Sequence, residues 1–179
     1  KKEFFISEMK AGKIFVYPTD TIYGIGCSGL DSTGVRKIRE LKLRDSKPFS
    51  VIVPGKDWIR DNCFINSGVE SWIAKLPGAY TLILKLRKNE GICSEVNNGG
   101  DSLGVRIPDN WFSSIVSECG ITFVTTSVNI SGEKNLEKLE DLDESIKEKV
   151  DYFIDEGVLA GRASTVVDLR DGENIISRE

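Results

Sequence analysis

Short apolar runs that end at glycine or proline alternate with helix-like segments along the chain. Ile14 to Val16 and Phe49 to Val53 are typical of strands, whereas Val35, Ile38 and Leu41 recur every three residues as on a buried helix face. This alternation predicts an α/β fold. At 179 residues, 40% of them hydrophobic, the chain is long enough for one core, so we expect a single domain over residues 1–179.

The pattern predicts elements with turn residues between them. We expect helices over 4–11, after Asp31 or Ser32, around Trp58 and Trp72, and over 110–118. We expect strands over 13–17, 49–53, 80–86, 103–107, 121–126, 152–155, 164–169 and 174–177. The Asn/Gly-rich stretch 97–100 is expected to close a hairpin. The run 121–126 is continuously apolar or threonine, which predicts a central strand, and the charged stretch 133–150 predicts a solvated loop and helix.

Two short polar motifs carry the first functional signal. Lys42-x-Arg44 is followed by Lys47, and Ser127-x-Asn129 comes later in the chain. Together they supply fixed positive charges and a hydroxyl/amide pair, which are suited to holding a polyphosphate while it is attacked. A Lys-x-Arg motif alone is more often a solvated basic edge that complements a helix dipole.

Three further segments place polar groups beside apolar strands. The segment 18–26, PTDTIYGIG, follows a strand-like run and is expected to be a strand-end loop. Arg106 lies inside the apolar run of SLGVRIP, where an unpaired charge would be costly. STVVD, 164–168, begins with two hydroxyls. Each hydroxyl alone is more simply a turn or cap group, so only the set favours nucleotide chemistry.

Composition excludes several classes of site. The chain has no histidine, which removes Ser-His-Asp and Cys-His catalysis and the usual metal ligands. Its four cysteines form no C-x-x-C pair and are expected to be reduced thiols. The net charge is −4, so any anion site must be a local basic cluster. No apolar run reaches ~18 residues and no signal-peptide pattern is present, so we expect a cytoplasmic protein.

Six segments in order from residue 18 to 169 resemble the YrdC-like family, the threonylcarbamoyl-AMP synthases that begin threonylcarbamoyladenosine modification of tRNA. They are PTDTIYGIG, KLR with KP, PGAYTLIL, SLGVRIP, SVNISG and STVVDL. The resemblance implies a three-layer YrdC-like α/β fold, a twisted mixed β-sheet with flanking helices around a basic cavity. It also implies the reaction, in which L-threonine, bicarbonate and ATP give threonylcarbamoyl-AMP and pyrophosphate.

The resemblance also implies residue roles. Lys42 and Arg44 would be catalytic. The residues that would bind ATP are Lys42, Arg44, Lys47, Ser102, Ser127, Asn129, Asn135 and Arg178. The residues that would surround threonine are Thr21, Arg106, Thr125 and Ser164, with Arg106 on the carboxylate. ATP is then a substrate, Mg²⁺ is carried by its phosphates, and no metal is held by protein side chains.

The chain departs from the family pattern at two points. The histidine that many relatives have near the threonine pocket is replaced here by Ile52, and the spacing from Arg44 to Lys47 is one residue shorter than usual. The expected partners are the threonylcarbamoyl transferase complex and tRNA, without a membrane. A second function remains open, a module that binds double-stranded RNA or tRNA without chemistry, whose binding should weaken steeply with salt.

Overall fold

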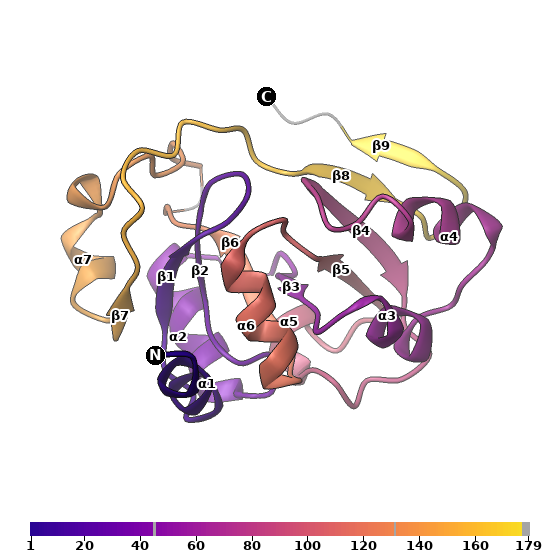
Figure 1. The fold of residues 1–179 in the computed structure, drawn as a ribbon, viewed down its shortest axis with the longest axis horizontal. Coiled ribbons are helices and arrows are strands. Elements are labelled where there is room, and N and C mark those ends of the chain that lie inside the picture. The colour runs from indigo at the N-terminus through magenta and orange to yellow at the C-terminus, as the bar shows by residue number, and fades with distance from the viewer. Residues whose placement is uncertain (45, 131, 177–179) are drawn as a thin grey trace.

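The computed structural model describes residues 1–44, 46–130 and 132–176 (Figure 1). The helices of this part are α1 Lys2–Lys10, α2 Ser32–Lys42, α3 Lys56–Asn62, α4 Ser67–Ile73, α5 Ser94–Asn97, α6 Trp111–Cys119, the 3₁₀ turn η1 Leu139–Asp141 and α7 Glu144–Lys147. The strands are β1 Phe15–Pro18, β2 Tyr23–Gly26, β3 Ser50–Ile52, β4 Tyr80–Lys85, β5 Ser102–Arg106, β6 Phe123–Ser127, β7 Tyr152–Phe153, β8 Thr165–Asp168 and β9 Asn174–Ile176.

Within the described residues the strands form one nine-stranded sheet in the order β7-β1-β2-β6-β3-β5-β4-β8-β9. The sheet is mixed, because β3 runs parallel to β5 and β4 parallel to β8, whereas β2, β6 and β3 pair antiparallel. The predicted α/β class and mixed sheet are therefore confirmed. The strand predicted to be central, now β6, lies between β2 and β3 as expected.

One face of the sheet is apolar along most of its width. Side chains such as Val16, Ile25, Val51, Val105 and Val124 are buried there. They pack with apolar residues of α2, α3, α4 and α5, which form one outer layer. Figure 1 shows α2 behind the strands and α6 in front of them.

The opposite face is covered over only part of its width. Phe15, Tyr17, Ile52 and Phe123 pack there against Met9 of α1 and against Phe112, Ile115 and Val116 of α6. Stacking of Tyr17 on Phe112, with ring centroids 4.1 Å apart, fixes the edge of this cluster. Beyond it the same face turns polar, and this change creates the candidate site.

Several local predictions are confirmed by the capping geometry. The Asp31 carboxylate accepts bonds from Thr33 N and Gly34 N at the start of α2. Gly120 ends α6 in the left-handed conformation, with φ of 75°. The stretch 133–150 holds only η1 and α7, in agreement with a charged loop and short helix.

Two sequence predictions were wrong in detail. The stretch 97–100 is not a hairpin loop, because Asn97 ends α5 and Asn98 is its left-handed C-cap residue, although β4 and β5 do pair antiparallel. The glycines of PTDTIYGIG do not lie in a loop either, because Gly24 and Gly26 belong to β2. A Cβ on Gly26 would meet Val124 O at 1.7 Å, and one on Gly24 would press on the Tyr17 ring at 3.1 Å. Because these glycines have no Cβ, Val124 O and the Tyr17 ring can approach the backbone of β2 closely.

Two further observations concern membrane-spanning helices and the state of the cysteines. None of the helices in the described ranges is long and apolar enough to span a bilayer. The four cysteines are free thiols, of which Cys27, Cys63 and Cys119 are buried.

Candidate active site

A polar cleft lies where the face of the sheet is no longer covered by α6. It is lined by Thr19, Thr21, Ile22, Tyr23, Gly24, Arg44, Ser50, Thr81, Arg106, Thr125, Thr126, Ser127, Ala163 and Ser164. Strand register explains why these groups meet, since Ser50 of β3 is opposite Gly104 of β5 and Thr125 of β6. The cleft has a volume of about 110 Å³, which suits an amino acid better than a whole nucleotide.

The loop between β1 and β2 is shaped by a threonine. Thr19 Oγ1 accepts bonds from Thr21 N and Ile22 N, both at 3.1 Å, and donates to Ile22 O at 2.6 Å. Thr19 is therefore a turn residue of the kind that competes for local backbone groups. The turn holds the half-buried Thr21 hydroxyl 3.0 Å from Thr19 Oγ1, at the wall of the cleft.

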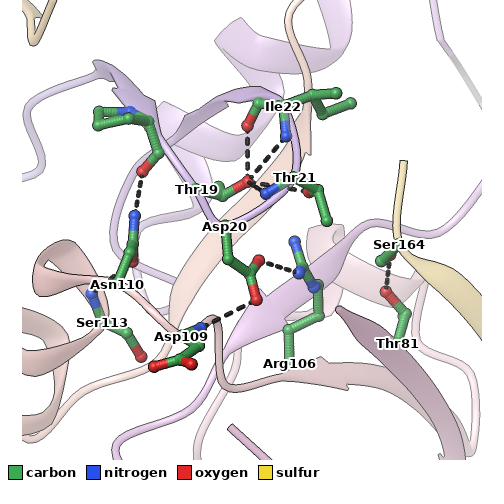
Figure 2. A network of polar contacts seen from close by, with 11 residues as sticks. Thr19, Asp20, Thr21, Ile22, Thr81, Arg106, Asp109, Asn110, Ser113 and Ser164 are labelled. Carbon is green, nitrogen blue, oxygen red and sulfur yellow. Dashed lines mark hydrogen bonds and ion pairs between the residues drawn. The ribbon is translucent and has the colours of Figure 1, made fainter. Parts of the chain in front are cut away.

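Arg106 lies at the end of β5 and forms a buried ion pair with Asp20 (Figure 2). Its Nη2 donates to Asp20 Oδ1 at 2.7 Å, and Asp20 Oδ2 accepts from Asp109 N at 2.9 Å. The Arg106 side chain is 6% exposed. Its Nε is buried and has no hydrogen-bond partner in the described part of the chain. Arg106 thus keeps a donor available beside the cleft.

A hydroxyl pair closes the side of the cleft opposite the β1–β2 loop. Thr81 of β4 and Ser164, just before β8, lie 2.5 Å apart through their hydroxyl oxygens and are both buried (Figure 2). Gly104 leaves β5 bare between β3 and β4, because a Cβ there would come within 2.5 Å of Ser50 Oγ and 3.3 Å of Thr81 Cγ2. The floor of the cleft is therefore backbone with hydroxyls around it.

The Lys42 side chain is buried and donates hydrogen bonds to groups of the protein itself. Its ammonium donates to Ser127 O at 2.5 Å, to Asn129 O at 2.9 Å and to Asn129 Oδ1 at 2.9 Å. Ser127 Oγ also donates to Asn129 Oδ1 at 2.7 Å. Burial of the side chain, and secondly the charge of Arg44, lower the pKa of Lys42 to about 7. The structure thus joins the two polar motifs through Lys42, and the predicted contact between Lys42 and phosphate stays a prediction.

Arg44 stands at the rim of the cleft, close to where α2 ends. It donates from Nη2 to Pro48 O at 2.6 Å and from Nη1 to Thr126 Oγ1 at 3.3 Å, and its guanidinium lies 5.0 Å from the centre of the Phe49 ring. Lys47 is exposed, and none of the residues described here accepts a bond from its ammonium. Arg44 therefore lines the cleft, whereas Lys47 does not, so the phosphate contact expected of Lys47 stays a prediction.

The cleft gathers some of the predicted residues and leaves others outside. Thr21, Arg44, Arg106, Thr125, Ser127 and Ser164 line it. Asn129 and the exposed Asn135 line a second cavity of about 420 Å³ behind the Ser127 loop, and Ser102, at the start of β5, lines neither cavity. Arg178 lies outside the described residues. The ATP contacts predicted for these groups remain predictions.

Polar residues at the site that were not predicted from the sequence include Asp20, Ser50, Thr81 and Thr126. Asp20 could have been found, because the charge of Arg106 in an apolar run requires a partner and Asp20 lies in the threonine loop. The others had no distinctive signal. Ile52, at the position of the family histidine, is fully buried in the α6 cluster and does not line the cleft.

Comparison with known proteins gives three related results. The Sua5/YciO/YrdC family model, described as telomere recombination, matches residues 7–179. A Methanocaldococcus jannaschii protein provisionally named a threonylcarbamoyl-AMP synthase is 38% identical over 181 residues, covering 99% of this chain and 84% of the relative. The crystal structure of P. abyssi Sua5 complexed with L-threonine superposes with a TM-score of 0.81 at 26% identity, covering 94% of this chain and 50% of that one.

A third protein extends the comparison to nucleotides. Full-length HypF in its phosphate- and nucleotide-bound form superposes with a TM-score of 0.85 at 25% identity, covering 99% of this chain and 28% of that one. The present chain thus corresponds to half of the Sua5 chain and to a smaller part of HypF. The fold predicted from the resemblance agrees with both superpositions.

Proposed function

Because the chain belongs to the Sua5/YciO/YrdC family, we propose that it is an L-threonylcarbamoyladenylate synthase. It forms threonylcarbamoyl-AMP and pyrophosphate from L-threonine, bicarbonate and ATP, for threonylcarbamoyladenosine modification of tRNA. The observation that carries this proposal is the cleft itself. It combines a buried arginine that has a donor to spare with a ring of hydroxyls, and it has a second arginine, Arg44, at its mouth.

The amino-acid substrate would occupy the inner part of the cleft. Arg106 would bind the threonine carboxylate while its Nη2 stays on Asp20, because a guanidinium has five N–H donors in a fixed fork. The Thr21, Thr125 and Ser164 hydroxyls would bind the amine and hydroxyl of threonine. The volume of the cleft and the L-threonine bound to the Sua5 relative both support this placement.

The nucleotide would then lie across the open mouth of the cleft. Arg44 and Lys47 would contact the phosphates there, and Lys42 would hold the Ser127–Asn129 turn against them from behind. The amine of threonine takes up CO₂ to give a carbamate, whose oxygen attacks the α-phosphorus in line. Such a step needs position and charge stabilisation and no covalent enzyme intermediate.

The proposal also covers the metal ion, the cellular compartment and the partner that takes the product. Mg²⁺ would enter with the ATP phosphates, since among the residues described no group of three or more acidic, cysteine or histidine side chains could hold a metal. The protein would work in the cytoplasm, where free thiols such as those here stay reduced. It would pass its product to the threonylcarbamoyl transferase complex, with or without a contact to tRNA.

The test is pyrophosphate release with ATP, bicarbonate and each amino acid in turn. We expect threonine-dependent release that Arg44→Ala lowers about a hundredfold or more, because a charged contact to the reacting phosphates is lost. Arg60→Ala is the matched control, since Arg60 is an exposed arginine paired with Glu70 on α4. Near-normal release by folded Arg44→Ala protein would contradict the assignment. Steeply salt-dependent RNA binding without release would favour the binding module instead.

A further inference from the structure

Arg39 is a buried arginine of α2 whose guanidinium donates five hydrogen bonds to four main-chain carbonyls. It is 9% exposed and lies one turn before Lys42. Nε and Nη2 donate to Glu95 O at 3.0 and 2.7 Å, and Nη2 also donates to Val96 O at 3.0 Å. Nη1 donates to Arg44 O at 3.3 Å and to Lys47 O at 2.8 Å. The guanidinium lies 4.3 Å from the centre of the Phe49 ring.

These bonds join two separate parts of the chain. One part is α5, and the other, which we call the phosphate segment, consists of Arg44, Ser46, Lys47 and Pro48. Two further bonds reinforce the junction, from Asn98 Nδ2 to Ser46 O at 2.6 Å and from Phe49 N to Val96 O at 2.9 Å. The phosphate segment is thus held through its backbone, and the Arg44 guanidinium itself donates to Lys47 O and Pro48 O of the same segment.

The carbonyls that Arg39 binds belong to Arg44 and Lys47, the residues expected to meet the phosphates. A guanidinium presents its donors in a planar fork and can hold two chain segments at once. A lysine at the same position has one compact ammonium on a flexible stem and can serve only one of them well. The geometry of the site therefore depends on arginine at position 39, although that side chain does not line the cleft.

We infer that Arg39 is a positioning residue that fixes the phosphate segment so that Arg44 and Lys47 face the ATP phosphates. This inference rests on the proposed function. It assigns Arg39 to the nucleotide half of the site and not to the threonine half, because Arg106 and its partner Asp20 have no contact with the Arg39 guanidinium among the bonds described.

The first experiment compares Arg39→Lys with Arg36→Lys. Arg36 is on the same helix one turn earlier, and it is an exposed residue whose guanidinium lies 3.7 Å from the Glu95 carboxylate. In pyrophosphate-release assays, Arg39→Lys should raise the KM for ATP about tenfold and leave the KM for threonine within about twofold, because only the phosphate contacts are misplaced. Arg36→Lys should change neither KM. An unchanged KM for ATP in folded Arg39→Lys protein, or equal rises in both constants, would overturn the inference.

The second measurement does not depend on activity. Hydrogen exchange of the Phe49 amide, which is bonded to Val96 O, reports directly on the junction. Arg39→Lys should speed this exchange while amides of the central strand β6 stay protected, and Arg36→Lys should leave it unchanged. If wild-type protein releases no pyrophosphate with any amino acid, the proposed function fails. Hydrogen exchange then still tests whether Arg39 holds the phosphate segment against α5. Equal exchange of the Phe49 amide in wild-type and Arg39→Lys protein would refute this positioning role.

Discussion

The buried ion pair between Arg106 and Asp20 offers the sharpest test of how the cleft is built. Asp20→Asn keeps the shape of the side chain but removes the negative charge. Both Asp20 oxygens accept bonds, from Arg106 Nη2 and from Asp109 N, so an amide would turn its NH₂ group toward one of these donors. The side chains of Arg106 and Asp20 are only 6% and 11% exposed, so water cannot replace the lost partner.

The expected loss follows from these burial values. Breaking a buried charge pair on one side typically costs about 3 to 5 kcal/mol, and we expect the lower end because an asparagine oxygen can still accept one bond. For a chain of this size, about 3 kcal/mol corresponds to a fall in Tm of about 6 to 12 °C. Much of that loss comes from leaving Arg106 without a counter-charge.

A double-mutant cycle separates this effect from simple loss of packing. Arg106→Met removes the charge that Asp20 balances, so the Asp20→Asn change should cost less in that background. We expect a coupling of about 2 kcal/mol between the two positions in urea unfolding at pH 7. The exposed pair Arg60 and Glu70 serves as a control cycle and should show no measurable coupling. Additive losses at positions 20 and 106 would refute the claim that this ion pair ties the β1–β2 loop to the end of β5.

Three other predictions concern charge and specificity. The pKa of Lys42 is lowered to about 7 against ~10.4 in the unfolded chain, so the unfolded state binds more protons above pH 7 and stability should rise with pH. Urea unfolding between pH 7 and about 8.5 should show a rise of about 1 kcal/mol per pH unit that Lys42→Met abolishes, and equal slopes would contradict the burial of the ammonium. Arg106→Lys should raise the KM for threonine more than the KM for ATP, because one ammonium cannot bind both Asp20 and a carboxylate. A rise in the KM for ATP alone would contradict the assignment of Arg106 to the threonine pocket. Pyrophosphate release should fall in the order threonine, serine, valine, with a serine gap of roughly tenfold, whereas equal rates for threonine and valine would mean that the substrate hydroxyl is not recognised.

The sequence predicted those features that depend on local pattern. Helix α2, its Asp31 cap and the position of Lys42 at its end all follow from residue spacing and capping preference. The interior position of β6 follows from its continuous apolar and threonine run. Arg106 was identified because an unpaired charge in an apolar strand would be costly, and in the structure its partner is Asp20.

The features that were missed depend on register. Ser50 and Thr81 lie in strands whose sequences look like ordinary core strands, and a small hydroxyl in such a run has no signal of its own. They line the cleft only because β3, β5 and β4 align Ser50, Gly104 and Thr81 on one face. The glycines of β2 were misplaced for a similar reason, since their need for space comes from Tyr17 and Val124 on neighbouring strands.

The two halves of the site are held by different arginines, and this difference bears on function. On the threonine side, Asp20 accepts hydrogen bonds from Arg106 Nη2 and Asp109 N. Asn110 Nδ2 also donates to Pro18 O at 2.8 Å, so the β1–β2 loop is tied to the start of α6. On the nucleotide side, Arg39 ties the phosphate segment to α5, and the bonds end on backbone carbonyls. The two networks share no hydrogen bond among those described. Changes at Asp20 should therefore act on threonine and changes at Arg39 on ATP, and swapped effects would show that the halves are coupled through the sheet.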